Sequence, residues 1–107
     1  MGYYTCYELS VDSPDYYDLE IIAQFRKENE NANWALGSDG STNGECKWYD
    51  HEDEMREFSK KHPDVLFTLK GEGEESGDMW YKYFKNGKMQ VAHARIEYDD
   101  FDPEKLV

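Results

Sequence analysis

Residues 44–74 decide the fold, and they read G44-ECKWYD-HEDEMREFSKKH-PDVLFTLKGEGE-74. A short β-prone run, an amphipathic helix and an apolar strand follow one another in this stretch. Spacings of four, three and four residues place four side chains on one helical face: His51, Met55, Phe58 and His62. The strand that follows alternates Val65, Phe67 and Leu69 with more polar positions, so we expect the helix to cover these three side chains.

Capping residues, charges and a proline mark both ends of this helix in the sequence. Asp50 stands at the N-cap position, and Glu52, Asp53 and Glu54 follow it near the positive end of the helix dipole. The last turn holds Lys60, Lys61 and His62, and the next residue, Pro63, stops the helix. The sequence therefore predicts a helix that begins after Asp50 and ends before Pro63.

The N-terminal part predicts a strand, a helix and a second strand. Residues Tyr3–Val11 alternate in polarity and predict the first strand. Asp12 or Ser13 caps the helix, Pro14 takes its first position and Asp15 favours its positive end. Its expected buried stripe is Leu19, Ile22, Ala23 and Phe25. Ala32–Leu36 is then predicted as a strand paired with Glu45–Tyr49 across a turn-rich segment.

The C-terminal part predicts a hairpin. Residues 71–78 form a glycine-rich acidic loop, and Met79–Lys85 and Met89–Tyr98 form two strands around the turn Asn86-Gly87. The acidic residues 99–107 are expected to be loosely held.

The predicted order of elements favours an α+β fold of the ferredoxin-like split βαβ type, with an antiparallel sheet, two helices on one face and the hairpin added at the sheet's end. A chain of 107 residues suits one such domain spanning residues 1–107. The expected core is Cys6, Leu9, Leu19, Ile22, Phe25, Trp48, Met55, Phe58, Val65, Phe67 and Leu69.

The run KWYDHEDEMREFSKKHPDVLFTLKGEGEESGDMWYKYFKNGK resembles the C-terminal ferredoxin-like domain of YubB-like proteins, which occur on plasmids, prophages and phages. The resemblance extends from Trp34 onward, and its marks are Trp48, Tyr49, His51, Glu52, Met55, Pro63, Gly71, Gly73, Trp80 and Tyr83. It implies the fold and a mobile-element origin, and it carries over no catalytic residue.

Composition restricts the partners. The chain has 12 basic and 24 acidic residues, and its net charge of −12 repels nucleic acids and anionic membranes. There is no apolar run long enough to span a membrane and no secretion signal, so we expect a cytoplasmic protein. Cys6 and Cys46 are expected to be reduced, buried thiols.

No motif indicates catalysis, a metal or a cofactor. The loop Lys70–Gly77 holds Glu72, Glu74 and Glu75, which repel phosphate, and the cysteines and histidines lack the spacings of a zinc site. Residues Asp39–Asp50 place several oxygen ligands at calcium-loop positions, although Lys47 falls at a ligand position and Asp50 is shorter than the usual Glu. A polar turn and a calcium loop remain alternatives there. We expect no enzyme.

Two sets of residues are candidates for binding a partner. The acidic set is Asp50, Glu52, Asp53, Glu54, Glu57, Glu72, Glu74 and Glu75; within it, Glu52, Glu54 and Glu57 form a helical trio and the last three a loop trio. The hairpin set, in a basic and aromatic segment, is Trp80, Tyr81, Lys82 and Lys85.

These features favour a small acidic binding protein, of the anti-CRISPR or DNA-mimic kind, that inhibits a host nucleic-acid-binding defence protein through the latter's basic surface. The alternative is a regulatory or assembly domain that pairs through its sheet face or edge, including with a second copy of itself.

Overall fold

The strand nearest the N-terminus, β1 (Thr5–Asp12), lies inside the sheet and pairs with two strands that are distant in sequence. In the computed structural model, which describes residues 2–14 and 18–107, β1 lies between β2 (Glu45–Cys46) and β3 (Leu66–Gly73). Strands β4 (Met79–Lys85) and β5 (Lys88–His93) continue the sheet on the far side of β3. All four pairings are antiparallel, and the strand order is β2-β1-β3-β4-β5.

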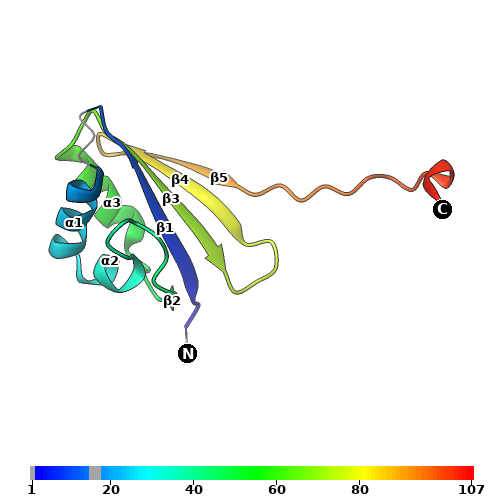
Figure 1. Ribbon diagram of the computed structural model, residues 1–107, viewed down its shortest axis with the longest axis horizontal. Helices are drawn as coiled ribbons and strands as arrows, with labels where there is room; N and C mark the ends of the chain where they lie inside the picture. Colours follow the sequence, from blue (N-terminus) through cyan, green and yellow to red (C-terminus); the bar gives the residue numbers. More distant parts are fainter. Residues whose placement is uncertain (1, 15–17) are drawn as a thin grey trace.

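The helices lie together on one face of this sheet (Figure 1). They are α1 (Asp18–Glu28), α2 (Glu30–Ala35) and α3 (His51–Lys60), and a short 3-10 helix, Pro103–Lys105, lies near the C-terminus. We call the sheet face toward the helices the covered face and the other the open face. The described part of the chain is therefore an α+β fold with a five-stranded antiparallel sheet and three α-helices. No helix among the described residues is long and apolar enough to cross a membrane.

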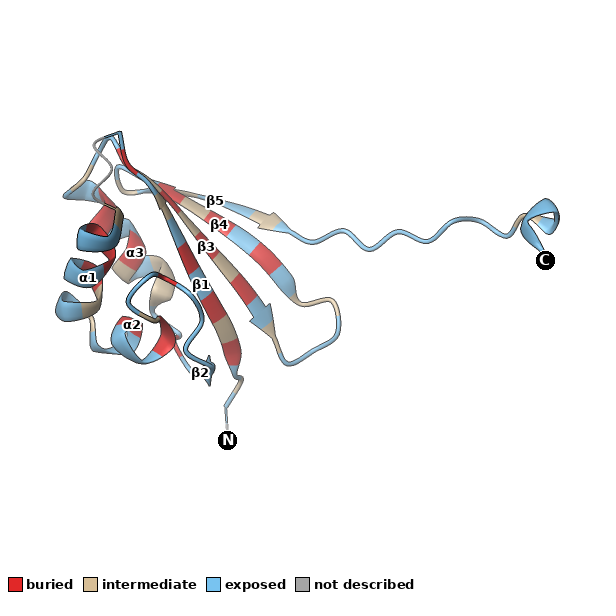
Figure 2. Ribbon diagram, viewed as in Figure 1, coloured by how far each residue is buried: buried red, intermediate tan, exposed pale blue. Residues whose placement is uncertain are grey.

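Burial alternates along each central strand, as the period-two pattern predicts (Figure 2). Thr5, Tyr7 and Leu9 of β1 are buried, and so are Phe67 and Leu69 of β3. Cross-strand partners lie on the same face, so Phe84 of β4, which pairs with Phe67, also points to the helices. The helix face predicted from residues 51–62 meets this surface, with Met55 and Phe58 fully or almost fully buried.

Trp48 lies at the centre of the core. Its indole is fully buried and contacts the rings of Tyr7, Phe25 and His51 at centroid distances of 5.2, 5.8 and 6.0 Å. Burial raises the pKa of the Tyr7 phenol to about 12, and its hydroxyl donates to the Trp48 carbonyl. Large aromatic side chains therefore supply much of the buried surface in this short chain.

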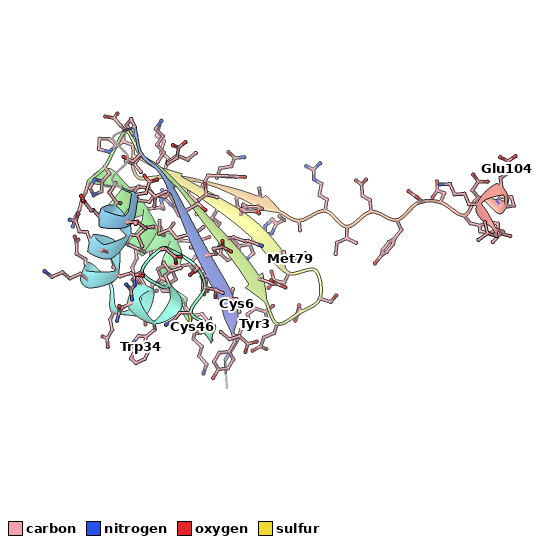
Figure 3. All side chains as sticks on the ribbon, viewed as in Figure 1. Tyr3, Cys6, Trp34, Cys46, Met79 and Glu104 are labelled. Atoms are coloured by element: carbon pink, nitrogen blue, oxygen red, sulfur yellow. The ribbon has the colours of Figure 1, made fainter. Side chains whose placement is uncertain are left out.

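The predicted strand at Ala32–Leu36 is wrong. Residues 30–35 form helix α2, because Ala32, Ala35 and Leu36 recur at the helical spacing of three and four, and all three are fully buried. Trp34 of the same segment is 66% exposed and points away from the domain (Figure 3). Only an isolated bridge between Leu36 and Thr42 stands where the sequence predicts a strand pair. The expected partner strand is reduced to β2, which pairs with β1 instead.

Two residues of the predicted core do not belong to it. Leu19 is 63% exposed, because α1 packs through Ile21, Ile22 and Phe25, which leaves Leu19 and Ala23 on the solvent side. Cys6 points to the open face and is only partly buried. The helix start predicted at residues 12–15 lies partly outside the described residues, because Asp15 is not among them.

Helix α3 begins at the predicted residue and ends at Lys60, so Lys61 and His62 follow the helix and are not part of its last turn, and its N-terminus is not capped as expected. Asp50 occupies the N-cap position without a side-chain cap hydrogen bond, and its backbone carbonyl accepts from the Glu54 N–H at 3.0 Å. The acids of the first turn still favour the positive end of the helix dipole.

Strands β4 and β5 are joined at Asn86-Gly87, where both residues have positive φ angles of 49° and 80°. This is the geometry that favours Asn-Gly in a two-residue turn. The second strand is shorter than predicted, since the last paired residue is His93 rather than Tyr98. Residues 95–107 leave the sheet as an extended tail that runs away from the domain (Figure 1).

Candidate protein-binding surfaces

Lys82, which the sequence places on a contact hairpin, is instead 9% exposed on the covered face. Its Nζ lies 2.7 Å from Nε2 of His51, 2.9 Å from Oε2 of Glu52 and 4.1 Å from the centroid of the Trp80 ring. These partners come from α3 and from β4 itself, so the ammonium group fastens the helix to the sheet. A buried cation is stable only when it is paired in this way.

The hydrogen bonds around His51 define its tautomer. Its Nδ1 lies 2.7 Å from the Trp48 carbonyl, which only accepts, so Nδ1 carries the proton and Nε2 accepts from Lys82. Burial lowers the pKa of His51, the neighbouring Lys82 charge lowers it further, and the bond to Trp48 acts in the opposite direction. The hydrogen bond from Lys82 lowers the pKa of Glu52. This arrangement favours a neutral imidazole beside a charged Lys–Glu pair.

Trp80 is also on the covered face. Its ring stacks on His51 with 5.3 Å between centroids and 11° between planes, and only 8% of the residue is exposed. Because side chains alternate along β4, the four residues of the hairpin set lie on two different faces of the sheet. Tyr81 points to the open face, where it stacks on Tyr83 at 6.3 Å, and Lys85 is exposed on that side. The four residues do not form one contact surface.

The acidic residues of the helical set also differ from one another, because some make contacts within the fold and others are exposed. Glu52 pairs with Lys82, and Oε2 of Glu54 accepts from the Trp48 indole N–H at 3.2 Å. Burial raises the pKa of Glu54, because its charged form loses solvent there. Glu57 is exposed and pairs with Lys60 at 2.9 Å. Asp50 and Asp53 are exposed as well. Two members of the helical trio thus hold the fold together and are not free for a partner.

The loop acids form the clearest exposed cluster. Glu45 and Glu72 both pair with Cys6 in the sheet, so they flank it on the open face, two strand spacings or about 10 Å apart. Glu74 and Glu75 follow at once in the loop, and all four carboxylates are exposed. We call Glu45, Glu72, Glu74 and Glu75 the acidic end. Glu45 was missed by the sequence reasoning, because only strand pairing brings it beside Glu72.

The N-terminal segment holds the acidic end in place. The Tyr3 hydroxyl donates to the Asp78 carboxylate and accepts from the Glu75 backbone N–H at 3.0 Å. The first of these bonds raises the pKa of the Tyr3 phenol. Oε1 of Glu74 accepts from the Tyr4 backbone N–H at 2.9 Å. The loop is therefore tied to the start of β1, where Figure 3 labels Tyr3.

Residues 2–14 and 18–107 contain no group of three or more His, Cys, Asp or Glu side chains able to hold a metal ion. In the segment proposed as a calcium loop, Asp39 accepts from both the Ser41 N–H at 3.0 Å and the Ser41 hydroxyl, and these bonds lower its pKa. Cys6 and Cys46 are free, and both are half-buried rather than fully buried. Burial raises the pKa of Cys46, which keeps it in the unreactive thiol form.

Comparison with known proteins adds no further constraint: no family model, no curated protein and no solved structure matches this chain.

Proposed function

We propose that this chain is a small acidic binding protein that inhibits a host nucleic-acid-binding protein by occupying its basic groove with carboxylates. The observation that supports this most is the acidic end, where the exposed Glu45 and Glu72 flank Cys6 of β1 on the open face and the exposed Glu74 and Glu75 follow in the loop after β3. They belong to a chain with a net charge of −12, which steers it toward a basic surface.

The position of these carboxylates favours binding without a large ordering cost. Tyr3 and Tyr4 fasten the loop through three hydrogen bonds, which hold its backbone at Glu75, the Asp78 carboxylate and the Glu74 carboxylate before a partner arrives. Preorganised contacts lose less conformational entropy on association than mobile ones. An anti-defence role in the cytoplasm of a host cell, as for a phage or plasmid product, is consistent with this surface.

The fold relationship is part of the same proposal. This proposal is supported by the order of α1, α3 and the strands β2, β1 and β3, which matches that of a ferredoxin-like split βαβ unit. Helix α2 stands where that unit has one further strand. We therefore retain membership of the YubB-like group as a proposal, and the β4–β5 pair as the element added to that unit.

The test uses grouped charge reversals, because a single exposed charge contributes little. Glu72, Glu74 and Glu75 are changed to Lys together, and the partner is sought by pull-down from host lysate at low and high salt. We expect association with the captured partner to slow about tenfold or more, and the complex to weaken as salt rises.

The matched control is the triple change Glu20→Lys, Asp64→Lys and Glu104→Lys, which alters net charge equally at exposed positions away from the acidic end. Urea denaturation of both variants verifies that they fold. Equal loss of binding in the two variants would show that only overall charge matters. Unchanged binding of the loop variant would refute the proposal.

A further inference from the structure

Strand β5 has an unpaired outer edge. It is the last strand in the order β2-β1-β3-β4-β5, and among the described residues no segment lies along its outer side. It carries only partial protection against pairing with another chain, since its lysine, Lys88, stands at the first position of the strand. An edge of this kind is a template for adding a strand.

The backbone directions along β5 follow from its pairing with β4. Ala94 donates its N–H to the Met79 carbonyl at 2.9 Å, so Ala94 directs its backbone groups toward β4. Because this orientation alternates along a strand, Gln90 and Ala92 do the same. Met89, Val91 and His93 therefore direct their N–H and C=O groups to the free edge. These are the groups that a further strand would satisfy.

The tail that follows β5 has the character of an unpartnered strand. It is extended and separated from the domain (Figure 1). Its large apolar side chains are exposed, with Tyr98 at 88% and Phe101 at 76%. The side chain of Ile96 lies beside Gly77 and is still more than half exposed. Apolar side chains that the domain itself leaves uncovered indicate a contact with something else.

We propose that the occupant of this edge is a second copy of the chain, and that β5 and the tail of one copy pair antiparallel with β5 and the tail of the other about a two-fold axis at His93. In this register His93 faces His93 of the second copy, Val91 pairs with Arg95 of the second copy, and Met89 with its Glu97. Every residue in these pairs is odd-numbered, so the backbone groups left free by β4 meet one another. The two sheets join into one.

Charge complementarity favours this pairing over other occupants. Lys85 and Lys88 flank the β4–β5 turn, and the tail carries Glu97, Asp99 and Asp100 after Arg95 and Ile96. The antiparallel register brings the acidic residues of each tail near the lysines of the other copy, and Tyr98 faces Lys88 on the open face. Opposite charges across a strand pair stabilise it, whereas a parallel arrangement would align like charges.

The surface at the turn also fits the tail. A hollow of about 490 Å³ opens there on the open face, lined by Leu66, Tyr83 and Gln90, with Lys85 and Lys88 at its rim. Because side chains alternate along a strand, the register places Tyr98 and Asp100 of the other copy on this face at the same end of the hairpin. An aromatic ring and a carboxylate match a hollow that has apolar lining and a lysine rim. This pairing uses surfaces distinct from the acidic end, so it holds or fails independently of the inhibitory function.

The first test is the oligomeric state of the full chain by sedimentation equilibrium over about a hundredfold range of concentration. We expect a reversible dimer of the 12.7 kDa chain. Tyr98→Lys places a like charge opposite Lys88 of the other copy and should weaken the dimer at least about tenfold. The matched control, Leu106→Lys, places the same charge at an exposed apolar tail residue outside the paired segment, and should change the dimer constant less than about twofold. A monomer at all concentrations, or equal effects of the two variants, would overturn the proposal.

The second test reads the register. Val91→Pro removes an N–H that β4 does not use and should abolish the dimer with the fold retained, whereas Val91→Thr keeps the N–H and should retain the dimer. If the proline variant unfolds, amide hydrogen exchange of the unaltered chain replaces it. Dimer formation should protect the amides of Val91, His93 and Arg95, while those of Gln90 and Ala92 are protected at all concentrations. Protection without this alternation would reject the register.

Discussion

Nζ of Lys82 lies 2.7 Å from Nε2 of His51, although both side chains are able to carry a positive charge. The contact is favourable because the imidazole is neutral and accepts the hydrogen bond, while Glu52 on the same helix neutralises the ammonium at 2.9 Å. The first turn of α3 is thereby joined to β4 by one charged hydrogen-bond network, whose other donor–acceptor pair is His51 with Trp48. Networks of this kind are stable only while every member keeps its protonation state.

Acidification should therefore destabilise the protein through His51. The folded state lowers the His51 pKa below the ordinary value of 6.5, so this stabilising contribution is fully present above pH 6.5. It is lost as the pH falls from 6.5 through the folded-state pKa, at no more than about 1.4 kcal/mol per pH unit. Urea denaturation between neutral and mildly acidic pH measures this slope. His51→Gln, which does not titrate, should flatten it, and an unchanged slope in that variant would contradict the assignment.

Gly71→Ala should destabilise the fold severely. A Cβ at this position would lie 2.1 Å from Cζ2 of Trp80, which is paired with Gly71 across the strands. The indole has no room to move, because it stacks on His51 and lies under Lys82. Overpacking of this kind costs about 1–3 kcal/mol or more in unfolding free energy. Gly37→Ala is the control, since the nearest atom to its Cβ is 3.2 Å away and it should cost much less. Equal midpoints of urea denaturation would refute the close approach.

Ser59→Ala should loosen the β4–β5 turn. The fully buried Ser59 hydroxyl accepts from the Gly87 N–H at 2.8 Å and donates to the Arg56 carbonyl at 2.8 Å. Alanine leaves the Gly87 N–H without its acceptor, which costs about 1–3 kcal/mol when the group stays dry. Amide exchange at Gly87 should accelerate together with the loss in stability. Ser76→Ala in the exposed loop serves as the control, and unaltered exchange at Gly87 would show that the bond is not made.

Phe58→Ala should remove a large part of the stability. Its ring contacts Phe25 at 4.9 Å and Phe67 at 5.7 Å, and joins α1, α3 and β3. Truncation of such a ring leaves a cavity and costs about 3–5 kcal/mol. Leu19→Ala on the exposed side of α1 should cost well under about 1 kcal/mol. A denaturation midpoint unchanged by the Phe58 substitution would show that its ring is not part of the core.

Periodicity alone was enough for the elements with a long or unambiguous pattern. The spacing of Met55 and Phe58, and the alternation of Phe67 and Leu69, predict the helix and the strand that pack together. Such patterns succeed because one face of each element must leave water. The segment Ala32–Leu36 was misassigned for the opposite reason. Five residues fit a strand and a helical turn equally well, and the burial of Ala32, Ala35 and Leu36 resolves the choice.

The sequence by itself determined the antiparallel α+β architecture, the position of the Asn86-Gly87 turn and the excess of acidic charge, because these depend on local preference and composition. Only the tertiary structure decided which charges are available to a partner. Glu52 and Lys82 look like unpaired surface groups in sequence, yet they form an ion pair between α3 and β4 in which the lysine is buried. Glu45 and Glu72 are 27 positions apart and meet only through β1. The physical reason is that a charged side chain can bind a partner only when no neighbouring group in the fold already pairs with it. Strand pairing and helix packing set those neighbours over sequence distances that no local pattern encodes.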